Sequence, residues 1–202
     1  MELLAPAGSR QALTAAVQSG ADAVYLGGPQ FGARYSAENF TIEEMKTWVD
    51  YCHLYGVDVH VTVNTLVKEK EIESLKEYLK QLNKIGVDAL IVQDMGAAEI
   101  IKKTVPDMTL HASTQMTVTS LEGVKYLEDM GFSRVVLARE LSEKEIEHIC
   151  KNAKAEIEVF VHGAICMCYS GQCLMSSILG GRSGNRGRCA QPCRLPYDLL
   201  EN

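Results

Sequence analysis

Cysteine is the residue type whose number and spacing in this chain point most directly to chemistry. Five of the seven cysteines lie between residues 166 and 193, at Cys166, Cys168, Cys173, Cys189 and Cys193. Thiolates are soft ligands that bind zinc, copper(I) or iron–sulfur clusters. The two close pairs lack the CxxC spacing of a zinc ribbon, whereas Cys166, Cys173 and Cys189 are spread out as cluster ligands can be. We therefore predict a metal site here, and the cysteines alone do not choose the metal.

The rest of the chain suits a protein whose thiols stay reduced. The cysteine count is odd, and the first ten residues, MELLAPAGSR, have an acid at position two and no basic stretch of a secretory signal. No apolar run is long enough to span a bilayer. We predict a cytoplasmic protein without membrane contact, in which clustered cysteines bind metal or act in catalysis. Cys52 and Cys150, on the apolar sides of predicted helices, are expected to be buried.

The charge of the chain is unevenly distributed. The formal net charge is −6, which argues against general nucleic-acid binding. From Val161 onward, however, the chain has two acids and four arginines, which are Arg182, Arg186, Arg188 and Arg194. The cysteine-rich stretch is therefore a basic patch on an acidic body, suited either to phosphate groups or to solvent.

Four glycines mark a repeated pattern, in which a helical stretch ends and a short apolar run begins: Gly20, Gly56, Gly86 and Gly131. Glycine is favoured just past a helix C-terminus because the backbone turns to positive φ there. The apolar runs are typical of parallel strands that are buried on both faces. Seven strands are predicted, at residues 3–5, 23–26, 58–63, 89–92, 109–111, 134–138 and 157–161.

Helical stretches alternate with these strands. They are predicted at residues 9–19, 41–55, 69–85, 96–104, 120–130 and 142–152, and two of them open with capping boxes, Thr41 with Glu44 and Ser142 with Glu145. Strict alternation predicts a parallel sheet, and seven units favour a TIM-like β/α barrel over an open sheet. We expect an incomplete barrel over residues 1–161 and a cysteine- and arginine-rich loop region, 162–202, in the same domain. The eighth strand is expected beyond residue 202, in a longer protein.

The chemistry of such barrels lies where the strands end, at the C-terminal face. Six polar residues there are candidates for catalysis: Asn64, Asp94, His111, Gln115, Arg139 and His162. Structural roles are also open to them, since Asp94 can cap the next helix, Arg139 can pair with Glu140 or Glu158, and the histidines can join polar networks. No lysine ends a strand, and no nucleophile elbow, HExxH motif or dinucleotide fingerprint is present, which argues against the corresponding enzyme classes.

The longest recognisable motifs surround the cysteines. EVFVHGAIC at residues 158–166 and SGQCLMS at 170–176 look like the signature of the U32, or collagenase-like, peptidase family. The runs LLAPAG (3–8), GADAVYLGG (20–28), HASTQM (111–116) and VVLARELS (135–142) resemble that family as well. The tail GGRSGNRGRCAQPCR at 180–194 is similar to the branch that includes the ribosomal RNA hydroxylation protein.

This resemblance implies functions of two kinds. The family is named for collagen-degrading activity, whereas other members take part in oxygen-independent hydroxylation of a transfer RNA uridine, a ribosomal RNA cytidine or the ubiquinone ring. Prephenate is implicated as the oxygen donor in the RNA branch. Those members resemble one another in a 4Fe-4S cluster on four cysteines, three of which correspond here to Cys166, Cys173 and Cys189. The fourth lies past the end of this chain, and Cys168 or Cys193 could substitute for it; zinc is the alternative metal.

The resemblance therefore favours prephenate-dependent hydroxylation of a tRNA or rRNA pyrimidine. In this interpretation the four arginines contact RNA phosphates and Asp94 is a general acid/base. Five side chains would surround a small carboxylate donor: Asn64, His111, Gln115, Arg139 and His162. The alternative is a peptidase with a protein substrate, and Cys166 with His162 could act as a thiol protease, since Ser176 and Ser177 have no obvious base in the sequence. A non-catalytic assembly or binding protein is the third interpretation.

Overall fold

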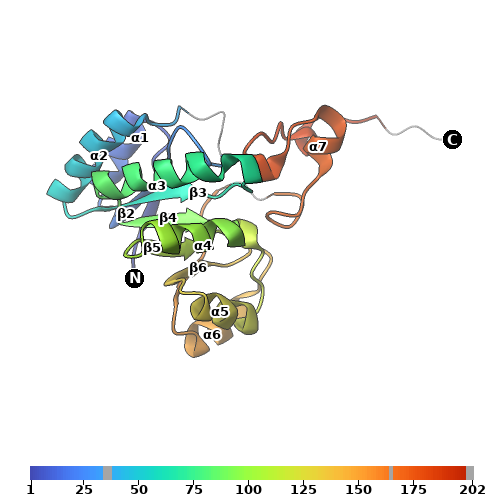
Figure 1. The fold of residues 1–202 in the computed structure, drawn as a ribbon. Coiled ribbons are helices and arrows are strands. Elements are labelled where there is room, and N and C mark those ends of the chain that lie inside the picture. The colour runs from blue at the N-terminus through green and yellow to red at the C-terminus, as the bar shows by residue number, and fades with distance from the viewer. Residues whose placement is uncertain (34–37, 164–165, 199–202) are drawn as a thin grey trace.

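Seven parallel strands form one curled sheet in the order of the sequence, in a computed structural model that describes residues 1–33, 38–163 and 166–198. The strands are β1 (Leu4–Pro6), β2 (Ala23–Gly27), β3 (Asp58–Val63), β4 (Ala89–Val92), β5 (Thr109–Ala112), β6 (Arg134–Val136) and β7 (Glu156–Glu158). The helices lie outside the sheet, as in a TIM-like barrel that is open between its first and last strands (Figure 1). The predicted fold class and the seven strands are confirmed, and the eighth strand stays a prediction.

Helices connect successive strands, as predicted. They are α1 (Arg10–Gln18), α2 (Ile42–Leu54), α3 (Ile72–Ile85), α4 (Met95–Thr104), α5 (Leu121–Asp129) and α6 (Glu143–Asn152), followed by the short α7 (Met175–Gly180). Turns of 3₁₀ helix lie at Glu69–Glu71, Thr114–Met116, Gly184–Arg186 and Pro192–Arg194. None of the helices in the described part of the chain combines the length and the apolarity needed to cross a bilayer.

Local sequence signals account for most of these boundaries. The four helix-ending glycines have φ values of 69° to 87°, in the left-handed region where a side chain is unfavourable. At the start of α2, the Thr41 hydroxyl accepts from Glu44 N while the Glu44 carboxylate accepts from Thr41 N. Both predicted capping boxes form, since Glu145 likewise accepts from Ser142 N at 2.7 Å.

The hydrophobic core lies between the outer face of the sheet and the helices. Val59, Val61 and Val63 of β3 belong to it. His60 and Thr62 alternate with these valines, so they face the inside of the barrel, because successive side chains of a strand point to opposite faces. Along β3 the inside of the barrel is thus polar, whereas the outer face of the strand packs in the hydrophobic core.

Two expectations about burial are wrong. The last strand ends at Glu158, and the three residues after it are exposed rather than buried, with Val161 at 88% exposure. β7 is an edge strand that pairs with β6, and no strand pairs with its other edge in the described part of the chain. Cys150 is exposed at the solvent side of α6, whereas Cys52 is buried, and burial raises the pKa of the Cys52 thiol to about 11.

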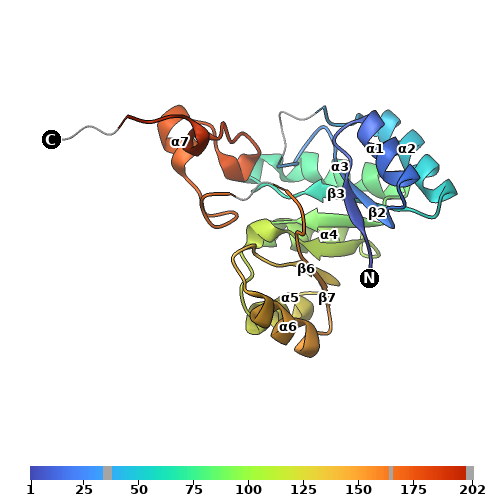
Figure 2. The same ribbon diagram turned by 180° about the vertical axis from the view of Figure 1, so that it is seen from behind.

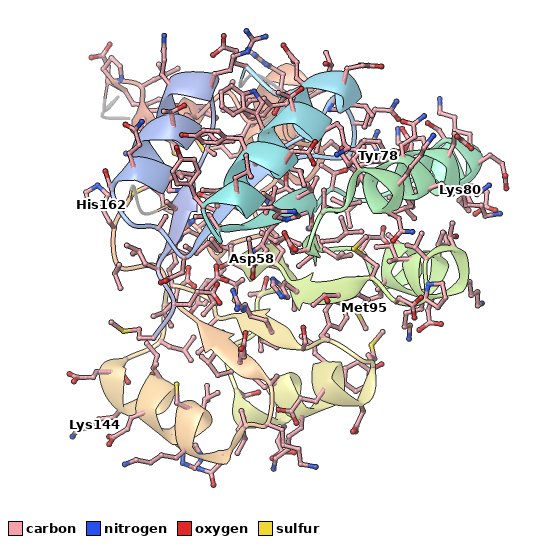
Figure 3. The ribbon with its side chains drawn as sticks, turned by 90° about the vertical axis from the view of Figure 1, so that its left-hand side faces the viewer. Asp58, Tyr78, Lys80, Met95, Lys144 and His162 are labelled. Atoms are coloured by element: carbon pink, nitrogen blue, oxygen red, sulfur yellow. The ribbon has the colours of Figure 1, made fainter. Side chains whose placement is uncertain are left out.

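Residues 166–198, here called the cysteine region, lie beyond the carboxyl ends of the strands. Figures 1 and 2 show this region, with α7, projecting from the barrel on the side away from the N-terminus. Figure 3 looks at the molecule from the opposite end, with Lys80 and Lys144 on the outer helices α3 and α6 and Asp58 near the centre of the view. The assignment of the cysteine region to the same domain stays a prediction.

Candidate functional site

A cavity of about 910 Å³ opens at the carboxyl ends of β1, β2, β6 and β7. Its walls are formed mainly by apolar side chains and backbone, together with the polar residues Asn39 and Thr62. Arg139 and His162 line it, and no carboxylate does so among the described residues. Its shape and charge therefore suit a small, partly apolar anion.

Arg139 follows β6 and is half-buried in the cavity wall. Its guanidinium lies 4.3 Å from the centre of the Phe160 ring, a cation–π contact. The expected alternative of an ion pair with Glu158 is wrong, because Glu158 instead approaches Arg134. Phe160 holds the Arg139 guanidinium without neutralising it, so the positive charge is available to a ligand.

His111 does not lie at the mouth, where the sequence reasoning placed it. It is buried on the inside of β5, and its ring stands perpendicular to that of His60 with 4.7 Å between centroids. Burial, together with the nearby His60 and Arg134, lowers the pKa of His111 to about 3, and the pKa of His60 is lowered for the same main reason. Both rings are therefore neutral at physiological pH, and they lie deeper than the cavity rim.

Arg134 is the centre of a charged network that the sequence reasoning missed. Its guanidinium donates to both carboxylate oxygens of Glu2, each at 2.6 Å, and to Glu156 at 2.5 and 2.8 Å. Glu158 lies 3.7 Å away, and burial raises its pKa to about 7 despite the positive charge of Arg134. The sequence did offer a signal for this network, namely charged residues within the predicted strands. Because side chains of a strand alternate between its two faces, these residues lie on the face that points into the barrel.

Asp94 and Asn64 have structural roles. The two Asp94 carboxylate oxygens accept from Ala97 N at 2.9 Å, which caps α4, and from Val67 N at 3.0 Å. The capping interpretation of Asp94 thus has direct support. Asn64 Oδ1 accepts from Ala33 N at 2.9 Å, which joins the segments after β2 and β3.

Close backbone contacts join the cysteine region to the barrel. At Gly187, a Cβ atom would come within 2.6 Å of the Gly32 carbonyl oxygen; at Gly171, it would lie 2.1 Å from that of Gln115. The Thr117 hydroxyl donates to the Ser170 carbonyl at 2.5 Å. The cysteine region therefore rests on the loops that follow β2 and β5. Gln115 contributes its backbone here, and its buried Oε1 has no hydrogen-bond partner in the described part of the molecule.

Arg186 makes a further connection, to the loop that follows β3. Its guanidinium donates to both oxygens of Glu71, at 2.8 and 2.6 Å, and to the Leu66 carbonyl at 2.6 Å. This ion pair lowers the pKa of Glu71 to about 2. The prediction that Arg186 contacts phosphate is therefore replaced by a structural role, while Arg182, Arg188 and Arg194 are exposed.

The cysteines of this region are reduced and partly or fully exposed. A Cβ built on Gly184 would lie 3.8 Å from the Cys189 Cβ and 3.9 Å from the Cys173 carbonyl oxygen, so these two cysteines flank one glycine. Cys189 Sγ accepts from Gln191 N at 3.3 Å. In residues 1–33, 38–163 and 166–198, however, no three potential ligands are gathered closely enough to hold a metal. The donor type suits a cluster, whereas the arrangement does not form a ready-made site.

Comparison with known proteins places these features in a family. The model of Peptidase family U32 matches residues 8–202. The chain is 46% identical over its whole length to the 23S rRNA 5-hydroxycytidine C2501 synthase of Escherichia coli, covering 30% of that protein. It is 42% identical over 99% of its length to tRNA hydroxylation protein P1 of Bacillus subtilis, covering 47% of it. The chain thus spans less than half of each of these relatives.

A solved structure supports the fold independently. The U32 peptidase Mk0906 superimposes with a TM-score of 0.68 at 22% identity, over 83% of this chain and 71% of that one. Sequence motifs, family model and architecture agree, and the chain belongs to peptidase family U32.

Proposed function

We propose that the protein takes part in oxygen-independent hydroxylation of a pyrimidine in tRNA or rRNA, with prephenate as oxygen donor. The observation that carries this proposal is the 46% identity, over all 202 residues, to a protein that is named as an rRNA 5-hydroxycytidine synthase. The exposed arginines of the cysteine region and the anion-suited cavity are consistent with the two substrates that such a reaction needs.

The carboxylate donor would bind in the cavity at the barrel mouth. Arg139 offers a positive charge, His162 also lines the cavity, and the apolar lining accommodates a carbocyclic body. Gln115 is not among the residues that line this cavity, and its buried side-chain oxygen could accept only from a hydroxyl or N–H group of a ligand. His111 is buried beside His60 and is not among the residues that line the cavity.

Cys166, Cys173 and Cys189 are the proposed ligands of a 4Fe-4S cluster, with Cys168 or Cys193 as the candidates within this chain for a fourth ligand. The support is the donor chemistry, together with the proximity of Cys173 and Cys189 through Gly184. Such a cluster supplies one-electron chemistry when it is bound.

The cluster is tested by iron and sulfide analysis of anaerobically purified protein. We expect about four of each per chain, lost in Cys189→Ser because a thiolate ligand is removed. Cys150→Ser is the matched control, since Cys150 is exposed on α6 and should leave iron content unchanged. An iron-free wild-type protein with stoichiometric zinc would refute the cluster and favour the zinc alternative.

The activity is tested by mass spectrometry of total RNA nucleosides. Deletion of the gene should remove one hydroxylated pyrimidine, and the wild-type gene should restore it. The Arg139→Gln variant should fail to restore it, because the cavity then lacks its positive charge. A nucleoside profile unchanged by deletion would defeat the RNA-modifying proposal and leave a non-catalytic binding role as the competing interpretation.

Peptidase activity is the second candidate, favoured by the family name. The site gives it less support, because the Ser176 hydroxyl is buried and accepts from Ala190 N at 3.0 Å. A peptidase should cleave gelatin without added iron and lose this activity in His162→Gln. Absence of cleavage at high protein concentration would remove this candidate.

A further inference from the structure

The cysteine region exposes several large apolar and aromatic side chains. They are Met167, Tyr169, Leu174, Ile178, Leu179, Leu195 and Tyr197. Exposed apolar surface of this kind marks interaction sites. The charged side chains of residues 166–198 are four arginines and Asp198, so the same region is also basic. A polyanion with flat apolar groups would complement both properties.

Tyr197 is held in place while its ring remains accessible. Its hydroxyl donates to the Pro192 carbonyl at 2.9 Å, and the residue is 63% exposed. Pro192 belongs to the 3₁₀ turn Pro192–Arg194, so the ring is attached to the turn that carries Arg194. A ring that is already oriented loses little conformational freedom when a flat group stacks on it.

Tyr169 is likewise an exposed ring on an anchored backbone. Its carbonyl accepts from Gln172 N at 3.1 Å, and the carbonyl of the next residue, Ser170, accepts from the Thr117 hydroxyl of the barrel. Ser170 is buried, whereas Tyr169 is about half exposed. The barrel therefore fixes the position from which this ring projects.

We propose that Tyr169 and Tyr197 are stacking platforms for unpaired RNA bases, next to arginines that contact the phosphates; this inference rests on the proposed RNA-modifying function. Bases in a duplex stack on one another, whereas unpaired bases present a free face to aromatic side chains. The surface should therefore select single-stranded or looped RNA over a double helix. Charge complementarity favours RNA over a protein segment as the occupant.

The test measures binding by fluorescence anisotropy, with a labelled single-stranded RNA of about 12 nucleotides and the same strand annealed to its complement. Wild-type protein should prefer the single strand. Tyr197→Ala and Tyr169→Ala should each weaken single-strand binding about tenfold, with an unchanged salt dependence because no charge is lost. Tyr197→Phe should retain most of the affinity, since the ring remains. Tyr126→Ala is the matched control, because Tyr126 is 60% exposed on α5, outside the cysteine region.

Equal affinity for single strand and duplex, or alanine variants that bind like wild type, would overturn the inference. If the tyrosine variants bind RNA normally but unfold at lower temperature, the surface packs against protein instead, and the inference is also wrong. Failure of the proposed function gives a different result: tyrosine-dependent RNA binding would persist although gene deletion leaves the nucleoside profile unchanged.

Discussion

Arg134 approaches both Glu2 and Glu158, yet the pKa values of these two carboxyl groups shift in opposite directions, because burial opposes the attraction. Its hydrogen bonds lower the pKa of Glu2, which is partly exposed. Glu158 is farther from the guanidinium and more deeply buried, so loss of hydration outweighs attraction and raises its pKa to about 7. The inside of the barrel therefore contains a carboxyl group that titrates near neutral pH.

The raised pKa of Glu158 predicts a pH-dependent stability. The folded state holds this proton up to about pH 7, whereas the unfolded chain releases it near 4.5, so the free energy of unfolding should fall as pH rises between these values. Glu158→Gln should remove this loss, and its stability relative to wild type should improve by about 2–3 kcal/mol from pH 4 to pH 8. Urea unfolding at several pH values measures it.

Glu147→Gln is the control for that experiment, because Glu147 is 61% exposed and pairs with Lys151 on the surface of α6. Its stability should follow wild type at every pH. If the profiles of Glu158→Gln and wild type run parallel, then burial does not raise the pKa of Glu158 as described.

Among the secondary-structure elements, the cysteine region is joined to the barrel by contacts from loops that follow three different strands. Gly187 lies against the segment after β2, Arg186 against Glu71 after β3, and Gly171 against Gln115 after β5. Two of these contacts require glycine because backbone atoms leave no room for a Cβ. The position of the cysteine region relative to the barrel therefore depends on two glycines, which have no functional group of their own.

Gly171→Ala should displace the cysteine region from the loop after β5. The new Cβ would lie 2.1 Å from the Gln115 carbonyl oxygen, and φ at this position is +80°. Hydrogen exchange followed by mass spectrometry should show faster exchange in residues 166–198. Gly181→Ala is the matched control, since φ there is +63° and no atom lies within 4 Å of the new Cβ.

Both substitutions carry the backbone cost of the left-handed region, about 1–2 kcal/mol. The additional effect of Gly171→Ala therefore reports the contact itself. Equal exchange in the two variants would show that the contact with Gln115 does not hold the cysteine region in place.

For the whole molecule, the distribution of charge separates an acidic body from a basic end. The formal net charge is −6, yet the cysteine region has four arginines and Asp198 as its charged side chains up to residue 198. Long-range repulsion from the body opposes RNA, and the exposed arginines create a local surface that attracts it. The pairing of Arg186 with Glu71 removes one of these arginines from that surface.

The salt dependence of RNA binding should distinguish Arg186, which is paired with Glu71, from the exposed Arg182. Arg182→Gln should lower the slope of log K against log salt by about 0.7 for a single strand, because Arg182 is exposed. Arg186→Gln should leave the slope nearly unchanged, because Glu71 already neutralises its charge. A slope lowered equally by Arg186→Gln would mean that Arg186 leaves Glu71 to contact phosphate.

Much of the fold was predictable because its signals are local. These signals are glycines after four helices, capping boxes before two helices, and apolar runs that form strands. Each depends on neighbouring residues, so Gly86 and Thr41 could be interpreted without knowing the fold. The same holds for the family, whose motifs are contiguous around Cys166. The end of β7 could not be predicted from local signals, because the exposure of Val161 depends on which strand lies beside β7.

The site residues show what the sequence by itself determined and what only the tertiary structure decided. The sequence alone determined that polar residues follow the strands and that arginines accompany the cysteines. Only the tertiary structure placed His111 beside His60 inside the barrel, Arg186 on Glu71 and Arg139 over Phe160. These pairs are 21 to 115 residues apart, and contacts of that kind follow from strand register and curvature, which no local pattern encodes.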